Sequence, residues 1–104
     1  MKGVELLTAY HRAYRKALEI HHKWQNGDEG KLLVQAEALV AAVRPVADIA
    51  GPDWHRSQSL ERHLNCLVHY LRAGEKDGAN TDIDDLIYAD LPGLCDELLR
   101  ISSK

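Results

Sequence analysis

The chain has 104 residues, which is enough for one domain with a continuous hydrophobic core. Its 45% hydrophobic and 28% charged residues are ordinary for a globular protein, and a net charge of −3 argues against general binding to nucleic acid or to a membrane surface. There is no phenylalanine, so the core is expected to be mostly aliphatic.

The first predicted helix covers residues 4–25. Apolar and aromatic side chains recur along it at steps of three and four, which places them on one helix face. This predicted stripe consists of Gly3, Leu7, Tyr10, Tyr14, Ala17, His21 and Trp24, with Leu6 and Ile20 beside it. Asn26 and Gly27 are expected to end the helix, because both residues tolerate the left-handed conformation of a C-terminal cap.

The second predicted helix covers residues 29–50 and begins after Asp28, a good N-cap. Its apolar rhythm passes through Pro45 without a change of phase, which predicts a kinked helix rather than two helices. Gly51 and Pro52 are expected to end it. The core positions of this rhythm are Leu32, Ala36, Leu39, Val43, Val46 and Ala50.

The second helix is unusual because its outward positions are also apolar. Between Leu32 and Ala50 only three residues are charged. Every helix of an isolated four-helix bundle shows one face to water, so this face is expected to be covered by a second copy of the chain. The predicted interaction surface consists of Val34, Ala38 and Ala41, with Leu6 and Ile20 contributed by the first helix.

The third and fourth predicted helices cover residues 54–73 and 82–101. Asp53 or Ser57 is expected to cap the third helix, and Gly74 to close it. Residues 75–80 are predicted to form a loop. The fourth helix is expected to start after Thr81 and to be kinked or split at Pro92.

These elements predict an all-α fold in which residues 1–104 form one antiparallel up-down-up-down four-helix bundle. Short connections favour antiparallel neighbours. Residues 1–25 carry five bases and two acids, whereas residues 75–104 carry eight acids and three bases. The first and last helices are therefore expected to lie side by side.

The sequence predicts neither a metal site nor a cofactor. The Glu-x-x-His spacing of Glu19 and His22 falls on the wet face of the first helix, and no second copy of that spacing exists. His63 and Cys66 lie three residues apart but lack two further ligands at a recognisable spacing. Cys66 and Cys95 are too few for a disulfide framework.

One segment of the third helix resembles an enzyme signature. Arg62 is followed by six residues and His69, and this spacing is similar to that of the HEPN ribonucleases, which are small dimeric helical bundles. The resemblance implies that Arg62 and His69 from two subunits cleave RNA without a metal. Histidine would transfer the proton and arginine would neutralise the phosphorane charge. Arg56 and His63 have the same spacing.

The overall layout resembles the flagellar export chaperones and related secretion chaperones. The resemblance consists of an alanine-rich second helix after Gly27-Asp28, a third helix rich in leucine and tyrosine, and an acidic start of the fourth helix. It implies a protein that holds the helix of a partner in a groove.

Three functional hypotheses follow from these observations. The favoured one is a non-catalytic interaction module that forms a homodimer and binds a partner protein. The second is the HEPN-like ribonuclease, and the third is a small-molecule-binding bundle or immunity-type protein. The N-terminal residues contain no apolar stretch typical of a signal peptide, so the cytoplasm is the expected location.

Overall fold

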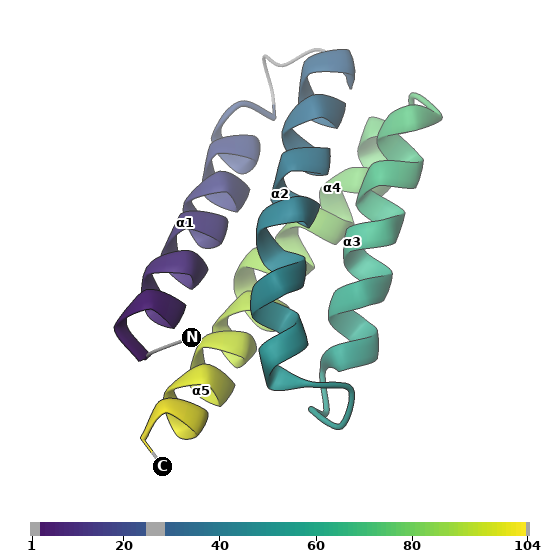
Figure 1. The fold of residues 1–104 in the computed structure, drawn as a ribbon. Coiled ribbons are helices and arrows are strands. Elements are labelled where there is room, and N and C mark those ends of the chain that lie inside the picture. The colour runs from purple at the N-terminus through teal and green to yellow at the C-terminus, as the bar shows by residue number, and fades with distance from the viewer. Residues whose placement is uncertain (1–2, 25–28, 104) are drawn as a thin grey trace.

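The computed structural model describes residues 3–24 and 29–103, and every regular element in these ranges is a helix (Figure 1). The elements are α1 (Gly3–His22), α2 (Glu29–Ala50), α3 (Ser57–Arg72) and a fourth helical segment made of α4 (Lys76–Asp85), the π-helical turn η1 (Leu86–Asp90) and α5 (Leu91–Ser102). The all-α prediction is confirmed, and this set of helices is compatible with a four-helix bundle. The predicted caps Asn26, Gly27 and Asp28 lie outside the described residues.

The core face of α1 differs from the predicted stripe. Leu6 is only 3% exposed and Ile20 is fully buried, whereas Leu7 and Tyr14 are half-buried. The reason is that α1 contacts both α2 and α5, so its buried face is centred on the neighbouring row of residues. The prediction that Leu6 and Ile20 contribute to an interaction surface is therefore wrong, because both side chains pack in the core of their own chain.

Helix α2 runs through Pro45 without interruption. Proline has no N–H to bond the carbonyl four residues earlier, which here belongs to Ala41. Both Pro45 and Ala41 are exposed, so water can reach that carbonyl. The predicted core residues from Leu32 to Val46 are buried, which confirms the phase of the helix on both sides of the proline.

The connection between α2 and α3 is a compact turn over residues 51–56. Gly51 has a φ of +86°, a conformation that favours glycine. The Trp54 amide donates to the Gly51 carbonyl, and the Ser57 amide donates to the Trp54 carbonyl at 2.9 Å. The Trp54 side chain is buried in this turn, so α3 begins at Ser57, three residues later than predicted.

The predicted loop over residues 75–80 is wrong, because α4 already begins at Lys76. Gly74, at φ +74°, ends α3 with two hydrogen bonds: its amide donates to Leu71, and the Glu75 amide donates to the Tyr70 carbonyl at 2.8 Å. A Cβ on Gly78 would lie 3.0 Å from the Tyr70 ring. The glycine that suggested a loop instead lets the first turn of α4 approach α3 closely.

The fourth helical segment is continuous across Pro92 but contains the π turn η1 just before it. The Leu91 amide donates to the carbonyl of Leu86, five residues back. A π turn is wider than an α turn, so it leaves more room for the ring of the proline that follows. In a regular α-helix, residues four apart point in directions that differ by about 40°. The wider π turn offsets this rotation, so residues at steps of four stay on one face of the segment. The residues buried at steps of four are Asp82, Leu86, Asp90, Leu94 and Leu98.

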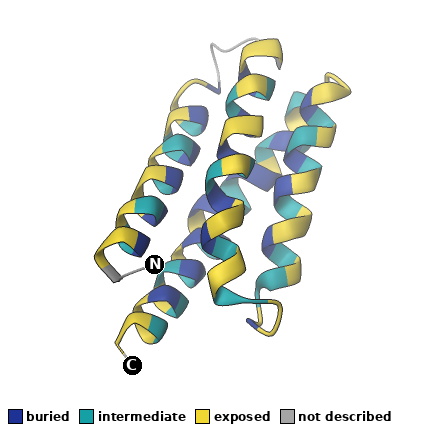
Figure 2. Cartoon of the chain, viewed as in Figure 1, coloured by how far each residue is buried: buried dark blue, intermediate teal, exposed yellow. Residues whose placement is uncertain are grey.

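The buried residues form one core, and in the cartoon the dark blue positions lie on the faces that the helices turn towards one another (Figure 2). Consecutive helices contact each other, and α1 also contacts α4, η1 and α5, which confirms that the first and last segments are neighbours. Nδ1 of His21 lies 3.4 Å from a carboxylate oxygen of Asp84 across this contact. The Tyr10 hydroxyl donates to the Leu91 carbonyl at 2.7 Å, and burial raises the Tyr10 pKa. None of the described helices has the length and apolar content needed to cross a membrane.

Candidate functional site

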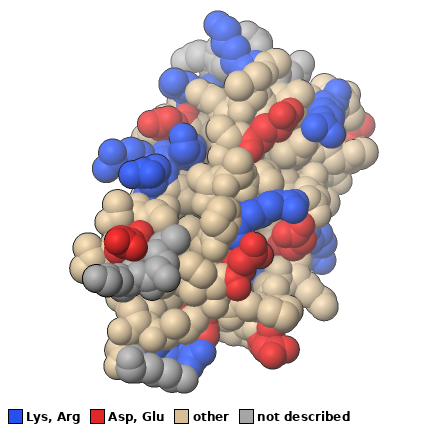
Figure 3. Space-filling model, in the orientation of Figure 1, with Lys and Arg blue, Asp and Glu red and all other residues tan. Residues whose placement is uncertain are grey.

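The outward face of α2 is an exposed row of apolar residues. Val34 is 69% exposed, and Ala38, Ala41 and Pro45 are exposed as well. Together with Ile49 they follow helical steps of four and three, so they lie on one face. These five residues are named the α2 stripe. In the space-filling view a strip of uncharged surface runs down the middle of the molecule, with basic groups gathered on one side and a row of acidic and basic groups on the other (Figure 3).

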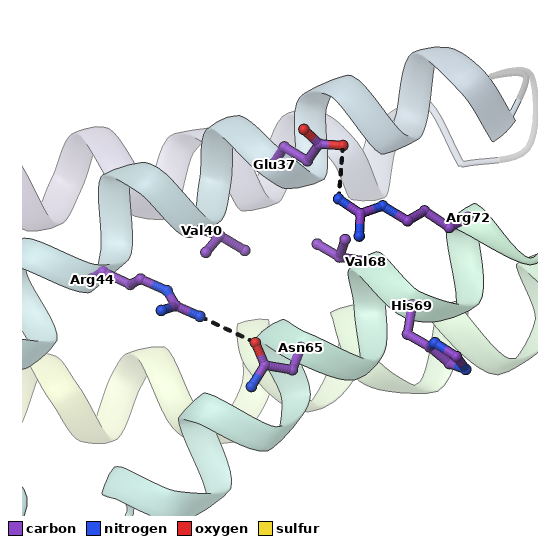
Figure 4. Close-up of a pocket in the computed structure, with 7 residues that line it drawn as sticks. All are labelled: Glu37, Val40, Arg44, Asn65, Val68, His69 and Arg72. Atoms are coloured by element: carbon purple, nitrogen blue, oxygen red, sulfur yellow. Dashed lines mark hydrogen bonds and ion pairs between the residues drawn. The ribbon is translucent and has the colours of Figure 1, made fainter.

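A pocket of about 330 Å³ lies beside the α2 stripe, between α2 and α3. Val40 and Val68 face each other across its middle (Figure 4). Arg72 and Glu37 close one end at 3.7 Å, and Arg44 donates to Asn65 at the other end at 3.1 Å.

The ion pairs at this pocket are exposed. Arg44 also contacts Glu61 at 2.9 Å, and the side chains of both pairs are about half exposed. Exposed pairs of this kind contribute about 0–1 kcal/mol because water and salt screen them. The pocket rim is therefore held by weak contacts that a ligand or a partner can replace.

The structure does not bring Arg62 and His69 together within one chain. Both are exposed on α3, about 10 Å apart along the helix axis. His69 lies on the pocket rim with its ring pointing away from Arg72 and Glu37 (Figure 4). Arg62 instead acts on α4, where its charge lowers the pKa of Asp82. Any joint action of Arg62 and His69 would require a second copy of the chain.

The opposite side of α3 carries a buried polar cluster centred on Asp90. The Asp90 side chain is fully buried in the π turn. Its two carboxylate oxygens accept from the Ser59 hydroxyl at 2.9 Å and from Nδ1 of His63, and the Arg56 guanidinium lies 3.6 Å away. Nε2 of His63 lies 3.2 Å from the carboxylate of Asp85. These five residues are named the Asp90 cluster.

The geometry of the Asp90 cluster differs from that of a hydrolytic triad. In a triad the serine contacts the histidine nitrogen that the aspartate does not hold. Here Ser59 and Asp90 both lie at Nδ1 of His63, and Ser59 donates to the carboxylate. Ser59 is therefore not activated as a nucleophile, and the cluster joins α3 to the π turn.

Asp82 lies next to this cluster and is buried, with one carboxylate oxygen that has no hydrogen-bond partner among the described residues. Burial raises the pKa of Asp82, and Asp85 raises it further, whereas the charges of His63 and Arg62 lower it. Burial also raises the pKa of the Cys95 thiol. Among the described residues, no group of three or more His, Cys, Asp or Glu side chains is placed to hold a metal ion.

The Asp90 cluster is not among the sites predicted from the sequence, where Arg56 and His63 stand only as a second Arg-x6-His spacing. In the structure these two side chains point to one carboxylate. The available signal was Asp90 itself, an acidic residue inside the apolar run from Leu86 to Leu91. An acid at such a position needs buried partners.

No family model matches the chain, and neither a curated protein nor a solved structure matches it.

Proposed function

We propose that the chain is an up-down-up-down four-helix bundle, bent at Pro45 and Pro92, that acts as a non-catalytic protein-interaction module. The α2 stripe pairs with the same stripe of a second copy, and the resulting homodimer binds a partner protein. Its two cysteines are free thiols, which suits a cytoplasmic location.

The exposed α2 stripe is the observation that supports this proposal. Isolated apolar side chains on a surface are ordinary, but here five of them follow one helix face over about four turns. The small side chains of Ala38 and Ala41 allow two helices to approach closely. Because a two-fold axis brings the same patch of both copies together, one apolar stripe suffices for a closed dimer.

The expected affinity is modest. Buried apolar surface contributes about 25 cal/mol per Å², and association costs at least about 4 kcal/mol in lost translational and rotational freedom. A stripe of a few hundred Å² per copy leaves a small surplus, which corresponds to a dimer in the micromolar range. The neighbouring pocket rim then offers exchangeable polar contacts for the partner.

The variant Val34→Glu with Ala41→Glu tests the proposal. Both positions are exposed in the single chain, so the variant should fold, and its added charges should make it monomeric in light scattering. Val4→Glu with Gln58→Glu adds the same charge at exposed positions outside the stripe and should leave the dimer intact. Equal dissociation of both variants, or of neither, would contradict the role of the stripe.

The second candidate function is a HEPN-like ribonuclease. Arg62 and His69 are both exposed on α3, so two copies that meet along this helix would place the arginine of one near the histidine of the other. A metal-free assay on single-stranded RNA decides between the two candidates. We expect no cleavage; cleavage that His69→Ala abolishes would replace the interaction module with the ribonuclease.

A further inference from the structure

A second hollow, of about 460 Å³, lies between the turn that precedes α3 and the start of α5. Its walls come from three places: Trp54 and Arg56 in the turn, Tyr88 in the π turn, and Gly93 and Asp96 in α5. π turns recur at functional sites because they redirect side chains. Tyr88, which is 71% exposed, lies in η1 and forms part of this wall.

The buried tryptophan of the hollow has an unused donor. Trp54 is 7% exposed, and its indole Nε1 is buried with no acceptor among the described residues. Buried N–H groups are nearly always hydrogen-bonded, so an exception calls for an acceptor. The Cζ2 edge of the same indole, next to the Nε1 side, packs against Gly93.

Arg56 has unused donors at the same place. A Cβ on Gly93 would lie 2.8 Å from Cδ of Arg56, so the absence of a side chain at Gly93 makes room for the arginine. Its side chain is 39% exposed, and its one ion pair among the described residues is the contact with Asp90 at 3.6 Å. Arg100 and Glu97 also line the hollow, but they bond to each other through two nitrogens of the arginine, so their charges offset one another.

The charges around the hollow select the ligand class. A simple anion would be attracted by Arg56 but repelled by Asp96, which is exposed and has no ion pair among the described residues. A simple cation would be attracted by Asp96 but repelled by Arg56. A molecule that carries both charges can pair with both side chains, and the aromatic walls of Trp54 and Tyr88 suit an apolar group.

We propose that this hollow binds a zwitterionic small molecule of the α-amino-acid class with an apolar side chain. The carboxylate pairs with Arg56 and reaches the indole N–H of Trp54, the ammonium pairs with Asp96, and the side chain packs against Tyr88. This site is separate from the α2 stripe and does not depend on dimer formation.

The binding test uses ¹⁵N-labelled full chain and three matched probes: leucine, 4-methylpentanoate, which lacks the ammonium group, and isoamylamine, which lacks the carboxylate. The chain has two tryptophans, so the indole signal of Trp54 reports on the hollow while that of Trp24 serves as an internal control. Leucine should shift the Trp54 signal at the lowest concentration, 4-methylpentanoate at a several-fold higher one, and isoamylamine should have no effect.

Two variants test the assigned contacts. Asp96→Asn, at an exposed position, should weaken leucine binding several-fold and strengthen binding of 4-methylpentanoate. Arg56→Gln should abolish both, whereas Arg44→Gln, an arginine outside the hollow, should change neither. The proposal is overturned if leucine leaves the Trp54 signal unchanged, if the three probes bind equally, or if Asp96→Asn affects leucine and 4-methylpentanoate alike.

Discussion

The two sides of α3 carry similar polar groups in opposite environments. On one side, Asp90 is fully buried and accepts from Ser59 and His63. On the other, Arg44 and Arg72 form half-exposed ion pairs around the pocket next to α2. The same kinds of side chain therefore have different effects: the buried set fixes one helix against another, whereas the exposed set leaves a surface that can exchange partners.

The difference follows from solvation. Removing one member of a buried pair leaves an uncompensated polar group, which costs about 3–5 kcal/mol. Removing one member of an exposed pair returns its partner to water at almost no cost. Stability measurements on variants from the two sides of α3 test this difference. Variants of the buried contacts should lose much of their free energy of unfolding, and variants of the exposed pairs should lose little.

The largest expected effect is that of Asp90→Ala. It leaves His63, Ser59 and Arg56 without their shared acceptor and removes the contact that joins α3 to the π turn, so the free energy of unfolding should fall by about 3–5 kcal/mol. Guanidinium denaturation followed by circular dichroism measures this loss. A loss below about 1 kcal/mol would show that the Asp90 cluster does not hold these elements together.

Asp82→Asn should have a smaller effect that depends on pH. Burial raises the folded-state pKa of Asp82 above its value in the unfolded chain, so the fold disfavours the charged carboxylate. That cost is present at pH 7 and disappears as the pH falls through the folded-state pKa towards the unfolded value of about 3.9. The variant should therefore be more stable than the wild type at pH 7, with the gain lost near pH 3. An equal effect at both pH values would contradict the assigned cause.

The smallest effect is expected for Arg44→Gln at the pocket rim. Its pair with Glu61 is exposed, so the free energy of unfolding should change by less than about 0.5 kcal/mol at 0.15 M salt. The same denaturation experiment measures this change, with Asp90→Ala as the comparison. A loss above about 2 kcal/mol would mean that the exposed side of α3 is also structural.

The sequence was informative where burial followed a simple period. The phase of α2, its passage through Pro45 and the exposure of Val34, Ala38 and Ala41 could all be predicted, because one regular helix fixes which residues share a face. The buried face of α1 is centred on the row that contains Leu6 and Ile20 rather than on the predicted stripe, because α1 contacts two neighbouring helices.

The start of the fourth segment and the Asp90 cluster could not be predicted, because both depend on tertiary contacts. Gly78 has low helix propensity, but it lies in a helix because the Tyr70 ring packs against it. The π turn changes the angular positions of the residues after Asp85, so a regular helical wheel does not show that Asp90 faces His63. The acidic Asp90 inside an apolar run indicates a buried partner, but no local pattern in the sequence identifies His63 as that partner or Tyr70 as the neighbour of Gly78.

The central claim is that the exposed α2 stripe pairs two copies of the chain. Sedimentation equilibrium of the wild type between about 5 and 500 μM tests it most directly, because a modest apolar dimer has its midpoint in the micromolar range. We expect a concentration-dependent rise from the mass of one chain, 11.7 kDa, to twice that mass, with little dependence on salt. A single species at the mass of one chain up to the highest concentration would contradict it.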